Sequence, residues 1–130
     1  MCIRDSQYRT HNIHLLRWCS TTPNVGGEYY ACGIGSALAG RGADLLLVDD
    51  PHSEQDVING NFEVFEKAYE WFTFGARTRL MPNGSVAIIQ TRWHMDDLTG
   101  RVTRDMANNK LSDQYEVLSL IHISEPTRPY

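Results

Sequence analysis

Two clusters of polar residues each follow directly on a short apolar run. Asp49 and Asp50 follow residues 45–48 (Leu-Leu-Leu-Val), and residues 90–94 (Gln-Thr-Arg-Trp-His) follow residues 86–89 (Val-Ala-Ile-Ile). Two adjacent carboxylates repel each other, which favours a cation beside them. In nucleoside triphosphatases one such carboxylate holds Mg²⁺ and the next polarises the attacking water. The same pattern is also typical of a plain turn at the end of a strand.

Thr91, Arg92 and Arg41 are the other residues suited to phosphate chemistry. A threonine hydroxyl at a strand end can sense a γ-phosphate and relay its loss to a neighbouring element, although it also commonly caps a loop. Arg92 can face a phosphate or form a surface salt bridge. Arg41 lies between Gly40 and Gly42, whose backbone freedom allows close approach to a phosphate of nucleotide or DNA; a plain turn is the alternative.

The apolar pattern predicts strands and helices in alternation. Strands are expected at residues 29–32, 45–48 and 86–89, of which the last two lack alternation and so suit strands covered on both faces. Asn61 is expected to cap a helix that runs to about Gly75. Its apolar face is formed by Phe62, Phe65, Tyr69 and Phe72.

The remaining segments predict a second helix and further turns. The helix is expected to open at Asp96 or Asp97, with an apolar face formed by Met95, Leu98, Val102 and Met106. Gly100 inside it is expected to cost about 1 kcal/mol. Residues 82–84 (Pro-Asn-Gly) predict a turn, residues 115–117 predict the start of a third buried strand, and residues 7–24 are only weakly patterned.

This order of elements predicts an α/β fold with a mainly parallel sheet and flanking helices. In parallel sheets the carboxyl ends of neighbouring strands meet at one edge, where ligands bind. We therefore expect Asp49, Asp50 and residues 91–94 to line the same edge of the sheet.

The composition suits one globular domain or a large part of one. Twelve Lys and Arg residues against sixteen Asp and Glu residues give a net charge of −4 over 130 residues. This balance excludes a diffuse basic coat for nucleic acid, but not a local basic patch. No apolar run approaches the roughly 20 residues that cross a bilayer, so no membrane insertion is expected. Three cysteines without a C-x-x-C pair argue against a zinc ribbon.

The two ends of the chain resemble a sequencing adapter. Residues 1–6 (Met-Cys-Ile-Arg-Asp-Ser) can be encoded by a string whose reverse complement encodes residues 118–122 (Leu-Ser-Leu-Ile-His) and the start of Ile123. Such an inverted repeat of roughly 17 nucleotides is typical of a fusion scar that takes no part in the fold. We therefore expect residues 1–6 and 118–130 to be artefacts, and residues 7–117 to be a piece of a longer protein.

Motifs spread over residues 22–117 are more specific together than singly. They are, in order, Gly26-Gly27-Glu28-Tyr29, Gly40-Arg41-Gly42-Ala43-Asp44 with Leu45-Leu46-Leu47-Val48-Asp49-Asp50-Pro51, Trp71, Thr78-Arg79-Leu80 with Pro82 and Gly84, and Gln90-Thr91-Arg92-Trp93-His94 with Asp97-Leu98 and Gly100-Arg101. This order and spacing resemble the large terminase subunit of tailed bacteriophages. The resemblance implies part of a helicase-like P-loop ATPase domain, of the motor that drives DNA into a prohead.

The resemblance also implies roles for single residues. Residues 45–50 would form the Walker B strand, with Asp49 on Mg²⁺ and Asp50 as the catalytic carboxylate, where many relatives have Glu. Thr91 would belong to the motif that couples ATP hydrolysis to DNA movement, with Arg92 beside it. Arg41, Gly40 and Gly42 would contribute to phosphate binding.

The expected partners follow from the same resemblance. They are ATP and Mg²⁺, double-stranded viral DNA, the portal protein of the prohead, the small terminase subunit, and further copies in a homo-oligomeric ring in the host cytoplasm. The chain has no phosphate loop of the type G-x-x-x-x-G-K-[ST]. We expect that loop upstream and a nuclease domain downstream, so residues 1–130 alone should hydrolyse no ATP.

Two other functions remain open at this point. A metal-dependent phosphoesterase could use Asp49 and Asp50 together with His52, His94, Asp96 and Asp97 at one edge of the sheet. A non-catalytic α/β binding module would instead have Asp49 and Asp50 in an ordinary strand-end turn.

Overall fold

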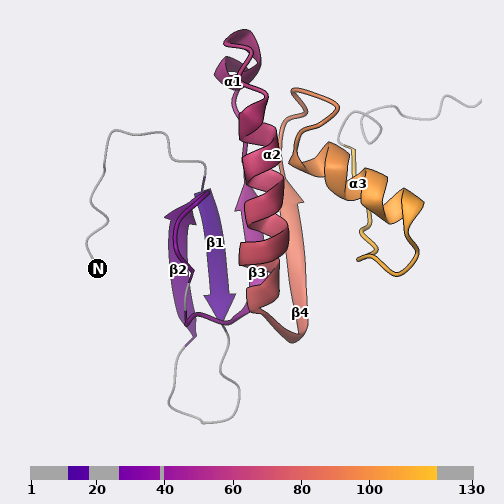
Figure 1. Ribbon diagram of the computed structural model, residues 1–130. Coiled ribbons are helices and arrows are strands. Elements are labelled where there is room, and N and C mark those ends of the chain that lie inside the picture. The colour runs from indigo at the N-terminus through magenta and orange to yellow at the C-terminus, as the bar shows by residue number, and fades with distance from the viewer. Residues whose placement is uncertain (1–11, 18–26, 39, 120–130) are drawn as a thin grey trace, which may run out of the picture.

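The computed structural model describes residues 12–17, 27–38 and 40–119, the first of these segments as backbone only (Figure 1). Its elements are β1 (Asn12–Arg17), β2 (Glu28–Gly33), β3 (Ala43–Asp49), α1 (Glu54–Ile58), α2 (Glu63–Glu70), a π-helical segment η1 (Trp71–Ala76), a 3₁₀ turn η2 (Arg77–Arg79), β4 (Leu80–Ile89) and α3 (Leu98–Asn108). The fold is mixed α/β. Except for residues 118 and 119, the two adapter-like ends lie outside the described residues.

The four strands form one sheet in the order β2-β1-β3-β4. β3 and β4 are parallel, but β1 runs antiparallel to both β2 and β3. The expectation of a mainly parallel sheet is therefore correct for β3 and β4 only. β1 lies in the segment whose weak pattern predicted no element, and its insertion between β2 and β3 produces the two antiparallel pairings.

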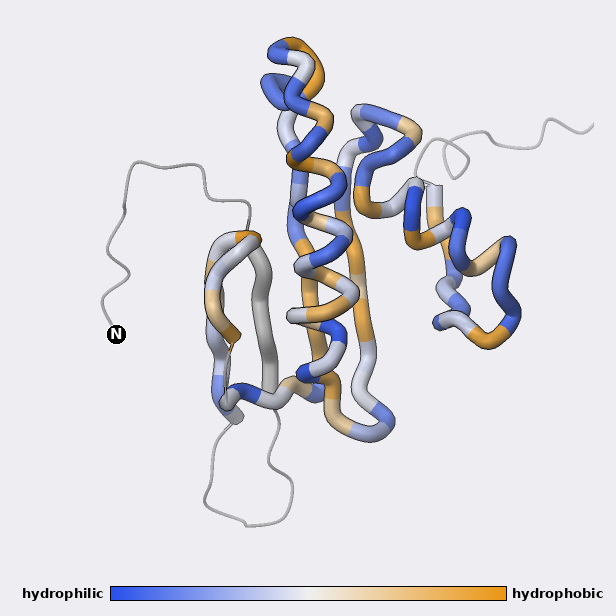
Figure 2. Tube along the Cα trace, in the orientation of Figure 1, coloured by the Kyte–Doolittle hydropathy of each residue, from blue (hydrophilic) through white to orange (hydrophobic). Residues whose placement is uncertain are grey.

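The helix over residues 63–76 covers one face of β3 and β4 (Figure 1). It buries Phe65, Ala68, Phe72 and Ala76, which recur at helical spacing. The predicted apolar face is confirmed at Phe65 and Phe72, whereas Phe62 is half exposed. The helix begins at Glu63 after Phe62, so the expected cap by Asn61 is wrong. Figure 2 shows the apolar stretches of β3 and β4 behind this helix.

β3 is fully buried on one face only. Leu46 and Val48 are completely buried in a cluster with Phe72 and Leu98, while Leu45 and Leu47 on the opposite face are half buried. The unbroken apolar run therefore predicted the strand correctly but not its burial on both faces, because the helix over residues 63–76 and α3 both pack on the face of Leu46 and Val48.

β4 and the segments after it differ in part from the predicted pattern. The strand starts at Leu80, and residues 82–84 lie within it at a shift of register, where Asn83 adopts a positive φ of 65°. α3 starts as predicted, with Asp97 as its N-cap. Residues 115–117 form no strand. In the part of the chain that the structure describes, no helix has the length and apolar character that a membrane crossing requires.

Candidate functional site

The tips of β3 and β4 lie side by side, as the sequence predicts. Asp49 is in register with Ile89, the last residue of β4. Beyond the strands, the Asp50 N–H donates to the Ile89 carbonyl oxygen at 2.9 Å, and the Thr91 N–H donates to Asp50 Oδ1 at 3.2 Å. The acid pair and the Thr91 segment therefore share one edge of the sheet and are joined directly by hydrogen bonds.

The two carboxylates at this edge are directed differently. Side chains alternate along a strand, so Asp49 and the buried Val48 lie on opposite faces of the sheet. The face of Asp49 is the one that α2 leaves uncovered. Asp50 has a left-handed backbone with a φ of 41°, a conformation that non-glycine residues adopt infrequently. Its carboxylate is thereby held against the amide of Thr91. Backbone strain of this kind concentrates at functional sites.

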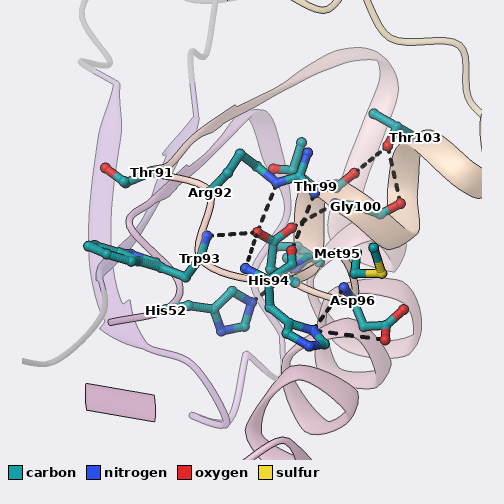
Figure 3. Close-up of polar contacts among 12 residues, drawn as sticks. His52, Thr91, Arg92, Trp93, His94, Met95, Asp96, Thr99, Gly100 and Thr103 are labelled. Carbon is teal, nitrogen blue, oxygen red and sulfur yellow. Dashed lines mark hydrogen bonds and ion pairs between the residues drawn. The ribbon is translucent and has the colours of Figure 1, made fainter. Parts of the chain in front are cut away.

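A buried carboxylate organises the loop after β4 (Figure 3). Asp97 has no exposed surface, and its Oδ2 accepts from Arg92 Nε at 2.8 Å, from the Trp93 N–H at 3.2 Å and from the His94 N–H at 3.4 Å. Its Oδ1 accepts from the Gly100 N–H at 2.8 Å, in the first turn of α3. Asp97 is thus both the N-cap of the helix and the anchor of the loop.

Of the two roles predicted for Arg92, a contact with phosphate or a salt bridge, the structure shows a salt bridge, to Asp97. Besides its bond to Asp97, its Nη2 donates to the His94 carbonyl oxygen at 3.3 Å. The guanidinium is half exposed, and its described contacts lie within the loop that begins at Thr91. In this arrangement Arg92 fixes the shape of the loop beside the two acids.

His52 joins the loop of the two acids to α3. Its ring is buried and lies edge-on to Phe65, with 4.7 Å between ring centroids. The Leu98 N–H, in the first turn of α3, donates to His52 Nε2 at 3.0 Å. Because Nε2 accepts this bond, we assign the neutral ring with its proton on Nδ1. Two contacts, Asp50 with Thr91 and His52 with Leu98, therefore connect the loop after β3 to the segment after β4.

The residues of the metal-dependent alternative are engaged in other bonds. His94 Nδ1 accepts from the Asp96 N–H at 3.1 Å, and Asp96 accepts from Arg104 at 2.7 Å. The hydrogen bond from Arg104, more than its charge, holds the pKa of Asp96 below its usual range. Asp97 and His52 serve α3 as described above. Within residues 27–38 and 40–119, no three His, Cys, Asp or Glu side chains converge on a position that could hold a metal ion.

Arg41, Gly40 and Gly42 lie away from the acid pair. Gly42 precedes β3 and Asp50 follows it, so the seven-residue strand separates them by about 25 Å. Arg41 pairs with Glu28 at 2.5 Å and stacks on the Tyr30 ring at 4.0 Å. The phosphate-binding role predicted for Arg41, Gly40 and Gly42 therefore concerns the opposite end of β3 from the acid pair, and it stays a prediction.

Gln90 is a further residue at this edge, and the sequence predicted no separate role for it. Its Nε2 and Oε1 atoms are both buried, and neither has a hydrogen-bond partner among the described residues. It follows Val86 and Ile88 at alternate positions of β4, and both of these pack against the core. A polar residue that continues the buried face of a strand was the available signal.

No protein-family model matches the chain, and searches of curated proteins and of solved structures find no match to it. Function is therefore inferred from the residues at the tips of β3 and β4.

Proposed function

We propose that this chain is the Walker B and coupling-motif part of a DNA-packaging ATPase, the large terminase subunit of a tailed bacteriophage. The observation that carries the proposal is the direct contact between Asp50 and the Thr91 amide at the ends of two parallel strands. A motor needs such a contact, because a change at the hydrolytic carboxylate must reach a neighbouring element. Here the contact continues through Arg92 and Asp97 into α3.

Asp49 suits the role of the magnesium ligand. Mg²⁺ is commonly held by one or two carboxylates together with water and substrate phosphates, so it needs no cage of three side chains. Asp49 offers such a carboxylate at the end of a strand, half buried, on the face that α2 leaves uncovered. When bound, Mg²⁺ would neutralise charge on the nucleotide phosphates. Asp50 would polarise the attacking water, and Thr91 would pass the change to the loop that Asp97 anchors.

The remaining parts of the proposal concern the whole motor. A longer reading frame would supply the phosphate-binding loop before these residues and the nuclease domain after them. The partners would be double-stranded viral DNA, the portal protein, the small terminase subunit and further copies of the same subunit in a ring. Arg41, at the opposite end of β3, would then contact DNA or another subunit instead of the nucleotide.

The decisive test is the coding sequence on both sides of this chain. We expect a G-x-x-x-x-G-K-[ST] loop upstream in the same frame. In the protein encoded by that frame, Asp49→Asn and Asp50→Asn should each abolish ATPase activity, whereas Asp44→Asn, on the same strand, should leave it within about twofold of the parent. Full activity of both variants, or a flanking sequence without a phosphate loop, would favour the binding module. Residues 1–130 alone should show no Mg²⁺-dependent turnover of ATP.

A further inference from the structure

The carboxamide of Gln90 is a buried polar group without a partner in the described chain. Both of its hydrogen-bonding atoms, Nε2 and Oε1, are shielded and unpaired. Folded proteins seldom leave such groups unpaired, because the amide loses its bonds to water on burial and regains nothing. Exchanging the oxygen and nitrogen in the assignment changes nothing, since both atoms are without a partner. The group therefore points to a bound molecule.

The position of Gln90 connects this molecule to the acid pair. The Asp50 N–H bonds to the residue before Gln90, and Asp50 Oδ1 bonds to the residue after it. Asp50 thus forms hydrogen bonds with the residues on both sides of Gln90. Asp50 and Gln90 are therefore neighbours across the ends of β3 and β4. The backbone of Gln90 therefore lies at the edge where the hydrolytic chemistry is proposed.

The two unpaired atoms also define the chemistry of the ligand. Nε2 must donate and Oε1 must accept. An oxygen of phosphate or of a carboxylate only accepts, so it satisfies Nε2 and leaves Oε1 unpaired. Water both accepts and donates, and it satisfies either atom.

We propose that Gln90 holds a water molecule between the tips of β3 and β4, beside Asp50. On the proposed function, on which this inference rests, that water is the one that Asp50 polarises, and Gln90 is its positioning residue. A neutral carboxamide suits this role because it orients the water without competing with Asp50 for the proton. Glutamine orients the attacking water in the same way in other nucleotide hydrolases.

The test is solution NMR of the 130-residue chain labelled with ¹⁵N. The side-chain amide pair of Gln90 is assigned by its loss in Gln90→Leu. We expect rotating-frame Overhauser transfer from water to this pair, together with slow exchange of its protons. Gln114 is the matched control, since it is exposed and donates to the Ser112 carbonyl oxygen; its amide should show rapid exchange only. A Gln90 amide that exchanges as fast as that of Gln114, or that is protected but receives no transfer from water, overturns the proposal.

Thermal unfolding provides a second readout that does not depend on the assignment. If the carboxamide is simply unpaired, Gln90→Leu removes a costly group and Tm rises. If it binds water, the substitution removes that bond and Tm stays the same or falls. Gln114→Leu, at an exposed site, serves as the control for the effect of added apolar surface. A Tm for Gln90→Leu above that of the parent chain, with Gln114→Leu unchanged, overturns the proposal.

A magnesium titration separates this inference from the proposed function. Mg²⁺ alone should shift the backbone signals of Asp49 and Asp50 at millimolar concentration, and Asp49→Asn should remove the response. Water transfer to Gln90 without any response to Mg²⁺ counts against the ATPase and supports the bound water. A response to Mg²⁺ without water transfer supports the acid pair and overturns the role of Gln90.

Discussion

Both ends of β3 carry polar residues that the sequence predicts to act in phosphate chemistry, but the two ends make different contacts in the fold. At the amino end, Arg41 forms an exposed ion pair with Glu28 and stacks on the ring of Tyr30, which is partly buried. At the carboxyl end, Asp50 is bonded to the backbone of the neighbouring strand. Side-chain pairs at a surface rearrange at little cost, whereas a carboxylate bonded to a backbone amide reports any movement of that backbone. On the proposed function, it is therefore the carboxyl end that would transmit a change.

The largest expected effect comes from removing the anchor of the carboxyl end. Asp97→Ala should lower the free energy of unfolding by about 3 kcal/mol, because the buried carboxylate accepts from the side chain of Arg92 and from three backbone amides. Urea denaturation of the chain and the variant measures this loss.

Asp97→Asn is the matched variant. It keeps one acceptor oxygen, so it should lose about half as much as Asp97→Ala. Substitutions at a surface usually change the free energy of unfolding by less than about 0.5 kcal/mol. If both variants fall within that range of the parent chain, Asp97 does not anchor the loop as described.

A glycine in α3 gives the next largest effect. A Cβ on Gly100 would run into the carbonyl oxygen of Met95 and lie 2.8 Å from Arg92 Nη2, in the loop that Asp97 anchors. Gly100→Ala should therefore destabilise the chain by about 1–2 kcal/mol, although alanine is normally the better helix former by about 1 kcal/mol. Differential scanning calorimetry measures the shift in Tm.

Gly75 provides the control for this substitution. It also lies in a helical segment, but a Cβ there would meet only the Trp71 ring, at an ordinary contact distance of 3.7 Å. Gly75→Ala should be neutral or stabilise the chain by up to about 1 kcal/mol. Equal effects at the two glycines would mean that α3 does not pack on the loop as closely as described.

The sequence predicted that the tips of the two strands lie together, but it did not predict the contacts that hold them in place. Two apolar runs, each followed by polar residues, predicted that Asp50 and Thr91 meet, because carboxyl ends of parallel neighbours share an edge. Nothing local could predict the bond from the Leu98 amide to His52, since 46 residues separate the two. Asp97 was predicted as a cap, but its further role depends on the path of a loop, which no periodicity encodes.

The same reasoning explains the errors in the fold. β1 has only six residues and a weak pattern, so its place between β2 and β3 depends on pairing with residues far along the chain. The Gly100 penalty was predicted from helix propensity alone, whereas the close approach of the loop makes glycine the residue that fits there. Local propensity is overridden wherever a tertiary contact reaches the backbone.

A substitution at the amino end of β3 should have a smaller effect. Arg41→Ala removes a surface ion pair and a contact with an aromatic ring, which together contribute about 1 kcal/mol. We expect the response of Asp49 and Asp50 to Mg²⁺ to remain unchanged in this variant. A loss of the Mg²⁺ response, followed by NMR, would show that the two ends of β3 act together.

The smallest expected effect is a shift in one titration at the carboxyl end. The hydrogen bond from Arg104 holds the pKa of Asp96 below its usual range. A folded-state pKa below the unfolded value means that the bond stabilises the fold above the unfolded pKa, and that this stabilisation is lost as the pH falls through the folded pKa. Arg104→Gln should therefore raise the pKa of Asp96, which ¹³C NMR of its carboxyl carbon measures. Arg41→Gln, at the other end of β3, should leave that pKa unchanged. If the two variants give the same Asp96 titration, the ionic contacts at the carboxyl end are no more specific than those at the amino end, and only the backbone bonds of Asp50 and Asp97 distinguish the two.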